Sequence, residues 1–428
     1  LEATSCLFAI LPPSRPGPPN PRRPPPALLA SCLGLLSLLP APAQDPAALL
    51  PPILQLGPEG AHNPEAAAAL AALSKAPASE IPRILAAINQ ANEISANYLR
   101  SAIDTITQRA LSSQTPLPSD PIRAFLRDPQ NHPRARRLAY ELLAKIAPAE
   151  AAALLPSFAD DPSTELRYDA VALLIQSAHQ RRDAQDKEGA IAAYQRALAP
   201  ARNQTQIDAI AGELRALGAE VDLPRHFGFL THWKVLGPFD NSELKGFAQP
   251  FPPETSLDLD LDSEYDGKNG KIRWQDLATG DDHGKVDLNP VLGELKEVTG
   301  YATTVFNSPV EGPAELRLGC KNGWKVWFNG QFLFGRDEYH RGARIDQYRL
   351  PVTLRKGPNT LLLKVCQNAD VKDWTREWEF QIRVCDASGT ALLATDRPPT
   401  PKPSPGAKPR SKSSAKTPPA PAPAPASK

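Results

Sequence analysis

The spacing of apolar residues changes once along the chain, near residue 224. From about 60 to 222, apolar side chains recur at three- and four-residue steps, the period of an amphipathic helix. Beyond this point they alternate with polar residues in short runs separated by Gly, Pro and Asn, as in strands. The pattern therefore predicts two domains, an α-helical one over 63–222 and a β-domain over 224–395.

Two stretches of the helical half resemble each other. PRARRLAYELLAKI begins at residue 133 and TELRYDAVALLIQSA begins 31 residues later, so that Arg136 matches Arg167 and Leu142 matches Leu173. An Asp-Pro pair precedes each stretch. This pattern resembles the HEAT repeat over about 119–178, with Ala and Leu facing inward.

A further segment, KEGAIAAYQRALA (187–199), resembles half of a tetratricopeptide repeat, with its second helix ending before Gly218. Together these resemblances imply a short α-solenoid that offers a surface to a protein partner. The alternative is a stalk that only positions the β-domain. One further choice stays open at the residues around Asn92, where the pattern fits one long helix or two.

Nine strand-like runs in about 165 residues predict a β-sandwich or jelly roll. They cover 232–241, 270–274, 299–308, 314–320, 324–330, 331–335, 348–357, 359–366 and 378–386.

The densest aromatic stretch is NGWKVWFNGQFLF, residues 322–334. Asn-Gly is the strongest signal for a two-residue hairpin turn, so Trp327 should face Phe332 and Val326 should face Leu333. Both faces of this hairpin are largely apolar, which favours a hairpin covered by protein. The alternative is an aromatic surface on which a sugar stacks.

The same region resembles a known family. LGCKNGWKVWFNGQFLF, VTLRKGPNTLLLKV and WEFQIRV, within about 316–385, are similar to the galactose-binding-like jelly roll, which includes the sugar-binding domain of glycoside hydrolase family 2 and accessory domains of exported bacterial proteins. The resemblance implies a jelly-roll fold and carbohydrate as the class of ligand. It covers none of the helices.

Two loops of the expected jelly roll hold the candidate ligand-binding residues. GRDEYHRGAR supplies Asp337, Tyr339 and Arg341, and DVKDWTREW supplies Trp374. Aromatic rings stack on sugars, and charged or hydroxyl groups bond to their hydroxyls. Ordinary surface loops are the alternative.

The sequence predicts no catalytic residues, metal site or cofactor. GxSxG, HExxH, GxGxxG and P-loop motifs are absent, and no CxxC occurs. We therefore expect a non-enzyme. The rival hypothesis is an enzyme of unrecognised type that acts on polysaccharide through loop carboxylates such as Asp337 and Glu338.

The N-terminal 43 residues have the pattern of an export signal. Arg22 and Arg23 precede an apolar run, and Ala41-Pro42-Ala43 fits a cleavage site. The pattern predicts export to the periplasm, cell surface or medium, followed by a linker over 44–62. Lipidation at Cys32, within LASC, is the alternative.

The C-terminal segment 396–428 is rich in Pro, Ala and Lys, and we expect a disordered tail. It carries seven Lys and Arg against one Asp, a composition that suits contact with anionic envelope surfaces. The alternative is a simple spacer. The first 43 residues hold +2, so the chain total of +1 leaves −7 for residues 44–395. An acidic folded part argues against nucleic acid as a partner.

Three cysteines follow the expected signal segment. If the strands at 361–366 and 380–385 form one hairpin, Cys366 and Cys385 are too far apart along the ladder for a disulfide.

These features together predict an exported, non-catalytic binding or scaffolding protein of the bacterial cell envelope, with a polysaccharide or glycan as its small partner. A purely structural scaffold without a small ligand is the first alternative.

Overall fold

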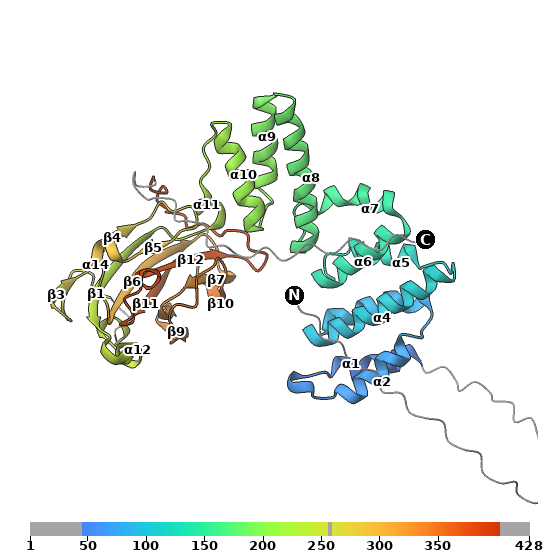
Figure 1. Ribbon diagram of the computed structural model, residues 1–428, viewed down its shortest axis with the longest axis horizontal. Coiled ribbons are helices and arrows are strands. Elements are labelled where there is room, and N and C mark those ends of the chain that lie inside the picture. The colour runs from blue at the N-terminus through green and yellow to red at the C-terminus, as the bar shows by residue number, and fades with distance from the viewer. Residues whose placement is uncertain (1–44, 256–258, 403–428) are drawn as a thin grey trace, which may run out of the picture. The chain divides into compact units, whose positions relative to one another are not determined.

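The computed structural model describes residues 45–255 and 259–402 (Figure 1). The expected export signal over 1–43 lies outside these residues, as does the tail beyond residue 402. Helices occupy the first part of the described chain and antiparallel sheets the second, which confirms the predicted order of an α-helical region and a β-sandwich. Among the described helices, none is both long enough and apolar enough to cross a bilayer.

The helical region runs from Pro46 to Phe227. Its elements are η1 (Pro46–Leu49), α1 (Leu50–Leu54), η2 (Pro58–Gly60), α2 (Asn63–Leu73), η3 (Ala78–Glu80), α3 (Ile81–Ala87), η4 (Ile88–Gln90), α4 (Glu93–Ser112), α5 (Ser119–Arg127), α6 (Pro133–Ile146), α7 (Pro148–Leu154), η5 (Leu155–Phe158), α8 (Thr164–Asp183), α9 (Lys187–Leu198), α10 (Gln204–Ala216) and α11 (Leu223–Phe227).

The helical pattern around Asn92 resolves into two helices. The Asn92 side chain accepts a hydrogen bond from the Ser95 backbone N–H at 2.9 Å and so caps the N-terminus of α4. Its amide also donates to the Leu56 carbonyl. The cap therefore both starts a helix and attaches α4 to the segment before α2.

The segment 44–62 was expected to be a linker, but its described residues from 45 onward are part of the helical core. It forms η1 and α1 and buries Leu49, Ile53 and Leu56, with Ile53 fully inaccessible. The proline-rich composition misled the prediction because Pro51 lies in the first turn of a helix, where its missing N–H costs nothing.

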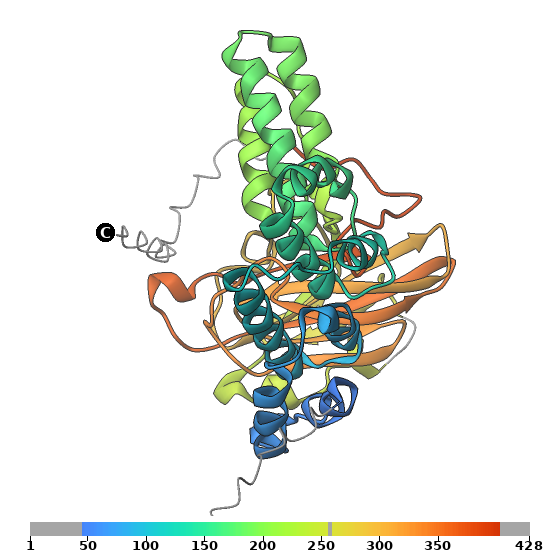
Figure 2. The ribbon, with the colours of Figure 1, turned by 90° about the vertical axis from the view of Figure 1, so that its right-hand side faces the viewer.

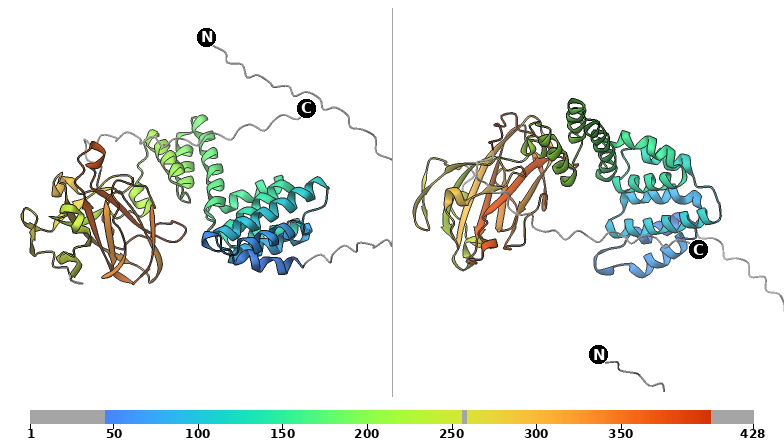
Figure 3. Two further views of the ribbon diagram at one scale, coloured as in Figure 1. Left: turned by 60° about the horizontal axis from the view of Figure 1, so that its bottom comes forward. Right: turned by 45° about the horizontal axis from the view of Figure 1, so that its top comes forward.

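The helices have two hydrophobic cores. The first extends from Leu49 to Ala170, and its blue-to-cyan helices stack side by side in Figure 3. The second lies among α8, α9, α10 and α11 and includes Phe227 and Phe229. Figure 2 shows α8, α9 and α10 running alongside one another. The long helix α8 contributes to both cores.

The two matched helices, α6 and α8, agree in part. Arg136 and Arg167 are both buried, and each is followed three residues later by a fully buried alanine. Leu142 is buried, whereas Leu173 is 38% exposed. The inward-facing pattern therefore holds for the arginine and alanine positions and fails at Leu173.

The β-region forms a sandwich of two sheets with a separate two-stranded ribbon. The strands are β1 (His232–Asp240), β2 (Glu264–Gly267), β3 (Gly270–Arg273), β4 (Gln275–Ala278), β5 (Val286–Asp287), β6 (Val298–Ser308), β7 (Gly312–Cys320), β8 (Gly323–Phe328), β9 (Gln331–Arg336), β10 (Tyr348–Leu354), β11 (Gly357–Gln367) and β12 (Glu379–Cys385). Short helical turns lie between them as η6 (Ser242–Leu244), α12 (Lys245–Ala248), α13 (Pro252–Thr255), α14 (Asn289–Leu292) and η7 (Asp373–Thr375).

One sheet has the order β4-β1-β6-β11-β8-β9 and the other the order β10-β7-β12-β5, while β2 pairs with β3. All nine predicted strand regions form strands. The sequence reading missed β2, β4 and β5, which are two to four residues long. The main core lies between the sheets and includes Trp324 and Trp378. A second apolar cluster, with Phe239, Phe251 and Tyr301, covers the outer face of the larger sheet.

The aromatic stretch forms the predicted hairpin of β8 and β9. Asn329 and Gly330 have φ values of 50° and 77°, the two positive values that a type I′ turn requires. Trp327 faces Phe332 as predicted. Val326, however, faces Phe334 instead of Leu333, because a bulge shifts the register by one residue.

The strands that carry Cys366 and Cys385 do not form one hairpin. β11 belongs to the six-stranded sheet and β12 to the four-stranded sheet. Cys320, Cys366 and Cys385 are buried free thiols, and burial raises the pKa of Cys366 to about 11.

Candidate functional site

The two predicted loops meet at the end of the sandwich. One joins β9 to β10 and the other joins β11 to β12. The rings of His340 and Trp374 lie 5.3 Å apart and nearly perpendicular, at 86°. His340 also bonds through Nε2 to Asn368 Oδ1 at 2.8 Å. His340 therefore joins the two loops, although the sequence reading did not single it out.

Trp374 lies in η7, which Thr375 fixes to the sandwich. Thr375 is fully buried, and its hydroxyl oxygen lies 2.7 Å from the carbonyl oxygens of both Asp370 and Lys372, to one of which it donates. Its own carbonyl accepts from Lys296 Nζ at 2.7 Å and from Gln367 Nε2 at 3.0 Å. The Trp374 ring is thus held by a rigid turn while remaining 55% exposed.

Tyr339 is directed toward the protein. A Cβ on Gly323 would lie 2.9 Å from the end of the Tyr339 ring, so the missing side chain at position 323 leaves room for the ring where it lies. The Tyr339 hydroxyl accepts a 3.4 Å hydrogen bond from the Asn241 amide. Burial, reinforced by nearby negative charges including Asp337, raises the pKa of Tyr339. We therefore assign Tyr339 to support of the loop.

Asp337 and Arg341 are exposed residues of the first loop. Arg341 extends to Glu338, with Nε 3.9 Å from the carboxylate, and 73% of its side chain is accessible. Glu338 also contacts Arg336 at 3.3 Å. Arg341 is thus accessible at the loop surface, whereas the Asp337 side chain, although exposed, also interacts with the Tyr339 hydroxyl.

Trp374 provides the surface best suited to stacking. Lys372 Nζ lies 5.4 Å from the centre of the Trp374 ring, within the range of a cation–π contact. An exposed, immobilised indole beside an ammonium group presents one apolar face and one hydrogen-bond donor. Such a pair can stack on a sugar ring and donate to its hydroxyls.

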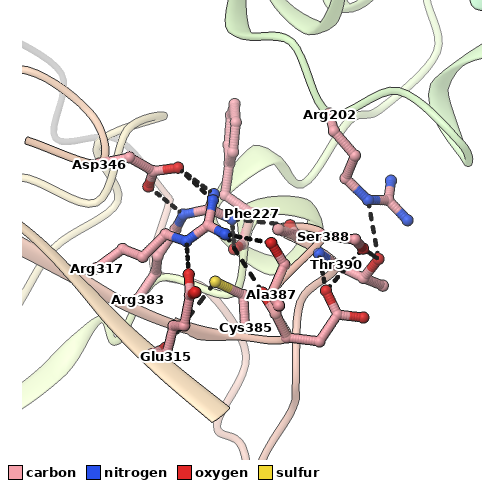
Figure 4. A network of polar contacts seen from close by, with 12 residues as sticks. Arg202, Phe227, Glu315, Arg317, Asp346, Arg383, Cys385, Ala387, Ser388 and Thr390 are labelled. Atoms are coloured by element: carbon pink, nitrogen blue, oxygen red, sulfur yellow. Dashed lines mark hydrogen bonds and ion pairs between the residues drawn. The ribbon is translucent and has the colours of Figure 1, made fainter. Parts of the chain in front are cut away.

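The sequence reading missed a cleft of about 580 Å³, lined by α8, α10 and the β-sandwich. Six arginines and four acidic residues line this cleft. Part of its wall is a network drawn in Figure 4. Arg317 and Arg383 face each other across β7 and β12, and Asp346 bonds to both guanidinium groups at 2.7 Å.

The network contains as many negative carboxylates as positive guanidinium groups. Glu315 accepts from Arg317 Nε at 2.7 Å, so two carboxylates meet two guanidinium groups. Burial opposes ionisation of Asp346, but the hydrogen bonds from Arg383 and Arg317 outweigh it and hold the pKa of Asp346 below its usual value. Arg383 Nη1 also donates to the Phe227 carbonyl at 2.9 Å, which ties the sandwich to α11.

Lys364 forms a separate buried charge cluster. Its Nζ has no exposed surface and donates to Glu254 Oε1 at 2.6 Å and to the carbonyls of Phe247 and Gln249. Tyr301 also donates to Glu254. Burial lowers the pKa of Lys364 against the opposing effect of Glu254. These contacts hold the segment 245–255 on the outer face of the larger sheet.

One feature of the sequence indicates the Arg317–Arg383 network and the Lys364 cluster. Arg317, Arg383 and Lys364 each stand between two apolar residues within a predicted strand. A charged residue at a buried strand position requires a partner, but the partners come from distant segments that a single sequence does not identify. Within residues 45–255 and 259–402, no group of three or more His, Cys, Asp or Glu side chains is arranged to hold a metal ion.

No protein-family model and no curated protein matches the sequence. Among solved structures, a PA14 sugar-binding domain from an RTX adhesin is 16% identical, with 22% of this chain and 55% of that chain covered and a TM-score of 0.15. Beta-glucosidase from Kluyveromyces marxianus is 10% identical, with 70% of this chain and 38% of that chain covered and a TM-score of 0.24. The matched region therefore spans about half or less of each structure's own length. At these TM-scores neither likeness supports an argument about function.

Proposed function

We propose that this protein is an exported, non-catalytic binding protein whose jelly roll takes a carbohydrate on the loop surface around Trp374. The observation that carries the proposal is the Trp374 ring, which is 55% exposed yet held by η7 and His340. Exposing a large aromatic ring to water is unfavourable, and fixing it there removes most of the entropy cost of stacking on a ligand.

The neighbouring polar groups fit a neutral or weakly charged polyol. Lys372 lies beside the ring, and Asp337 and Arg341 are accessible on the facing loop. Together they present hydrogen-bond donors and acceptors around one apolar surface, which is the composition of a small sugar site. The resemblance of 316–385 to galactose-binding-like jelly rolls supports the same class of ligand, and that of 119–178 to HEAT repeats supports a role of the helices in presenting the sandwich.

A glycan array probed with the full chain, followed by titration of the best-bound glycan, tests this function. Trp374→Ala should weaken binding by about 1–3 kcal/mol, roughly five- to 150-fold, if the indole stacks on the sugar. The matched control is Phe332→Ala, because Phe332 on the edge strand β9 is 56% exposed and also aromatic. The control should bind as the unaltered chain does.

Two outcomes would contradict the proposal. Absence of binding to every glycan by a folded chain would favour the structural scaffold. Equal losses in the Trp374 and Phe332 variants would place the sugar elsewhere. Turnover of a polysaccharide that is lost in Asp337→Ala would instead support the enzymatic alternative.

A further inference from the structure

The charges that line the cleft between α8, α10 and the sandwich are not fully compensated. Arg100 and Arg137 contact Glu141 at 2.6 and 3.1 Å, and Arg317 contacts Asp346. The three other arginines of the cleft are Arg167, Arg202 and Arg349. They form no ion pair within the described part of the chain, and the cleft adds only the exposed Glu165 as an unpaired acid.

Arg167 is the most informative of these residues because it has an internal counterpart. Arg136, at the matching position of α6, is 2% exposed and forms two bonds to the Asp161 carboxylate, at 2.6 and 2.7 Å. Arg167 is 6% exposed and bonds only to two carbonyls, those of Asp160 and Asp161. Its Nη1 is buried without a partner. The residue 31 positions after Asp161 is Ala192, so the chain supplies no equivalent carboxylate.

An uncompensated guanidinium at this depth is costly. Removing a charge from water without an ion pair has a penalty of several kcal/mol. Arg136 avoids that penalty because the Asp161 carboxylate, in the turn before α8, forms an ion pair with it. Arg167 has no such carboxylate, and it is one of the residues that line the cleft.

Arg202 adds a second cation at the same place. Its Nε donates to Thr390 Oγ1 at 3.1 Å, and its Nη1 donates to two backbone carbonyls; Figure 4 shows it reaching from the helical side toward Thr390. Burial and the charge of Arg167 lower the pKa of Arg202, against the opposing fields of Asp386 and Asp160. The Asp386 carboxylate is itself occupied by Ser388 and the Thr390 N–H.

The helix N-termini at the cleft also favour a negatively charged ligand. The N-termini of α8, 20 residues long, and α10, 13 residues long, both border the cleft. Helix N-termini carry partial positive charge and favour anions. Gln206 links them, since its Nε2 donates to the Tyr168 carbonyl at 2.8 Å.

Gln206 also identifies a second property of the ligand. It is 6% exposed, and its Oε1 is buried without a partner. Rotating the amide would turn this oxygen toward the Tyr168 carbonyl, so the bond to Tyr168 fixes the oxygen as an open acceptor. A ligand that satisfies both unpartnered atoms must offer an oxyanion to Arg167 and a donor such as a hydroxyl to Gln206.

We propose that the cleft at the junction of α8, α10 and the 386–390 turn binds a small hydroxylated organic anion, a sugar acid or sugar phosphate. Its oxyanion lies against Arg167 and Arg202, and one of its hydroxyls donates to Gln206 Oε1. The cleft volume of about 580 Å³ is within the range of small-molecule sites. The site shares no residue with the loop surface around Trp374 and does not depend on the function proposed for it.

Titration calorimetry on the full chain tests the site with four probes at constant ionic strength. Glucuronate and glucose 6-phosphate carry the two kinds of oxyanion, glucose has the hydroxyls without the charge, and inorganic phosphate has the charge without the hydroxyls. We expect at least one of the two sugar anions to bind more tightly than both glucose and inorganic phosphate. The better sugar anion identifies the oxyanion.

The variants assign that binding to the cleft. Arg202→Gln should weaken it roughly tenfold or more, as expected for loss of a charge-assisted hydrogen bond, and Gln206→Ala should abolish the preference over the inorganic anion. Arg196→Gln is the matched control, because it removes the same charge from an exposed position on α9. Arg167→Gln should lose binding while the free protein keeps or gains thermal stability, since an uncompensated buried charge is removed.

Three results would overturn the proposal. These are no heat with either sugar anion, equal affinity for glucose, and equal effects of Arg202→Gln and Arg196→Gln. None of them bears on glycan binding at Trp374, which is measured with a different variant.

Discussion

Two histidines with opposite protonation preferences lie on the same aromatic ring. His226 and His283 contact Phe227 at centroid distances of 5.7 and 6.1 Å, at the junction of the helices with the sandwich. Burial lowers the pKa of His226 to about 4, assisted by the positive charges of Arg202 and Arg383. The hydrogen bond to Asp208 raises the pKa of His283.

These shifts give opposite contributions to the stability of the fold. The unfolded chain binds a proton at His226 below about pH 6.5 and the folded chain does so only near pH 4, so stability is lost as the pH falls through this window. His283 instead stabilises the fold while it is protonated, and its contribution is lost as the pH rises through its raised pKa. The folded state therefore loses the contribution of His226 as the pH falls and that of His283 as the pH rises.

His226→Gln should reduce the loss of stability between pH 6.5 and 4 by as much as about 3 kcal/mol, at roughly 1.4 kcal/mol per pKa unit. Glutamine can still donate to the Ala201 carbonyl that His226 contacts at 3.1 Å. Urea unfolding at a series of pH values, for the variant and the unaltered chain, measures the difference. Parallel stability curves for the two proteins would show that His226 titrates normally in the fold.

At the residue scale, the sequence predicts which side chains have the chemistry to bind a ligand, but it does not predict the direction in which they point. Trp374 was predicted as a candidate and is exposed. Tyr339 was predicted with it but turns inward, because Gly323 leaves room for its ring. The arginine cleft was not predicted at all, since Arg167 and Arg202 become neighbours only through the packing of α8 against the following helices.

At the scale of elements, local patterns were reliable where local interactions determine the structure. Asn329-Gly330 forms the predicted type I′ turn, because the turn depends on a few adjacent residues. The choice that was left open at Asn92 is settled by a cap on the N-terminus of α4. The bulge in β9 was not predictable from local pattern. It shifts Leu333 relative to β8 and leaves Phe332 and Phe334 exposed at the sheet edge.

The hairpin consequently has tryptophans in two different environments. Trp324 is 1% exposed between the sheets, whereas Trp327 is half-buried on the outer face, with its ring 5.6 Å from Phe332. Trp324→Ala should cost about 3–5 kcal/mol, and Trp327→Ala should cost clearly less, about 1–3 kcal/mol. Chemical denaturation of both variants measures the order, and a larger loss for Trp327→Ala would contradict this assignment.

At the scale of the whole molecule, the change of period near residue 224 does not mark the edge of a core. Phe227 and Phe229 are 3% and 1% exposed and pack in the helical core formed with α8, α9 and α10. Phe229 also pairs with Arg383 at the edge of β12. The predicted boundary near residue 224 falls at the start of α11 (Leu223–Phe227), ahead of the first strand at His232, and it divides a region of shared packing.

The C-terminal boundary of the β-region also extends beyond residue 395. Asn307 donates to Asp396 at 2.6 Å, and Arg397 donates to the Phe229 carbonyl at 2.8 Å. The composition of the expected tail gave no sign of these contacts, because each depends on a partner far away in the sequence. A fragment that preserves the sandwich should therefore extend beyond Arg397.

We expect the fragment 224–402 to unfold cooperatively but at a lower temperature than the fragment 163–402, which keeps α8, α9 and α10. Its sandwich core between the two sheets is intact, but Phe227 and Phe229 lose their cover. Exposing two phenylalanine rings costs about 3–6 kcal/mol at 1.5–3 kcal/mol each. Calorimetry on both fragments measures the difference in melting temperature.

The substitution Phe227→Ala is the internal control. That substitution should lower the melting temperature of the long fragment more than that of the short one, because in the short fragment the ring keeps its contacts with Phe229, His283 and Arg383 but loses those with α8, α9 and α10. Equal effects in the two fragments would mean that the helices contribute nothing to the stability of the sandwich.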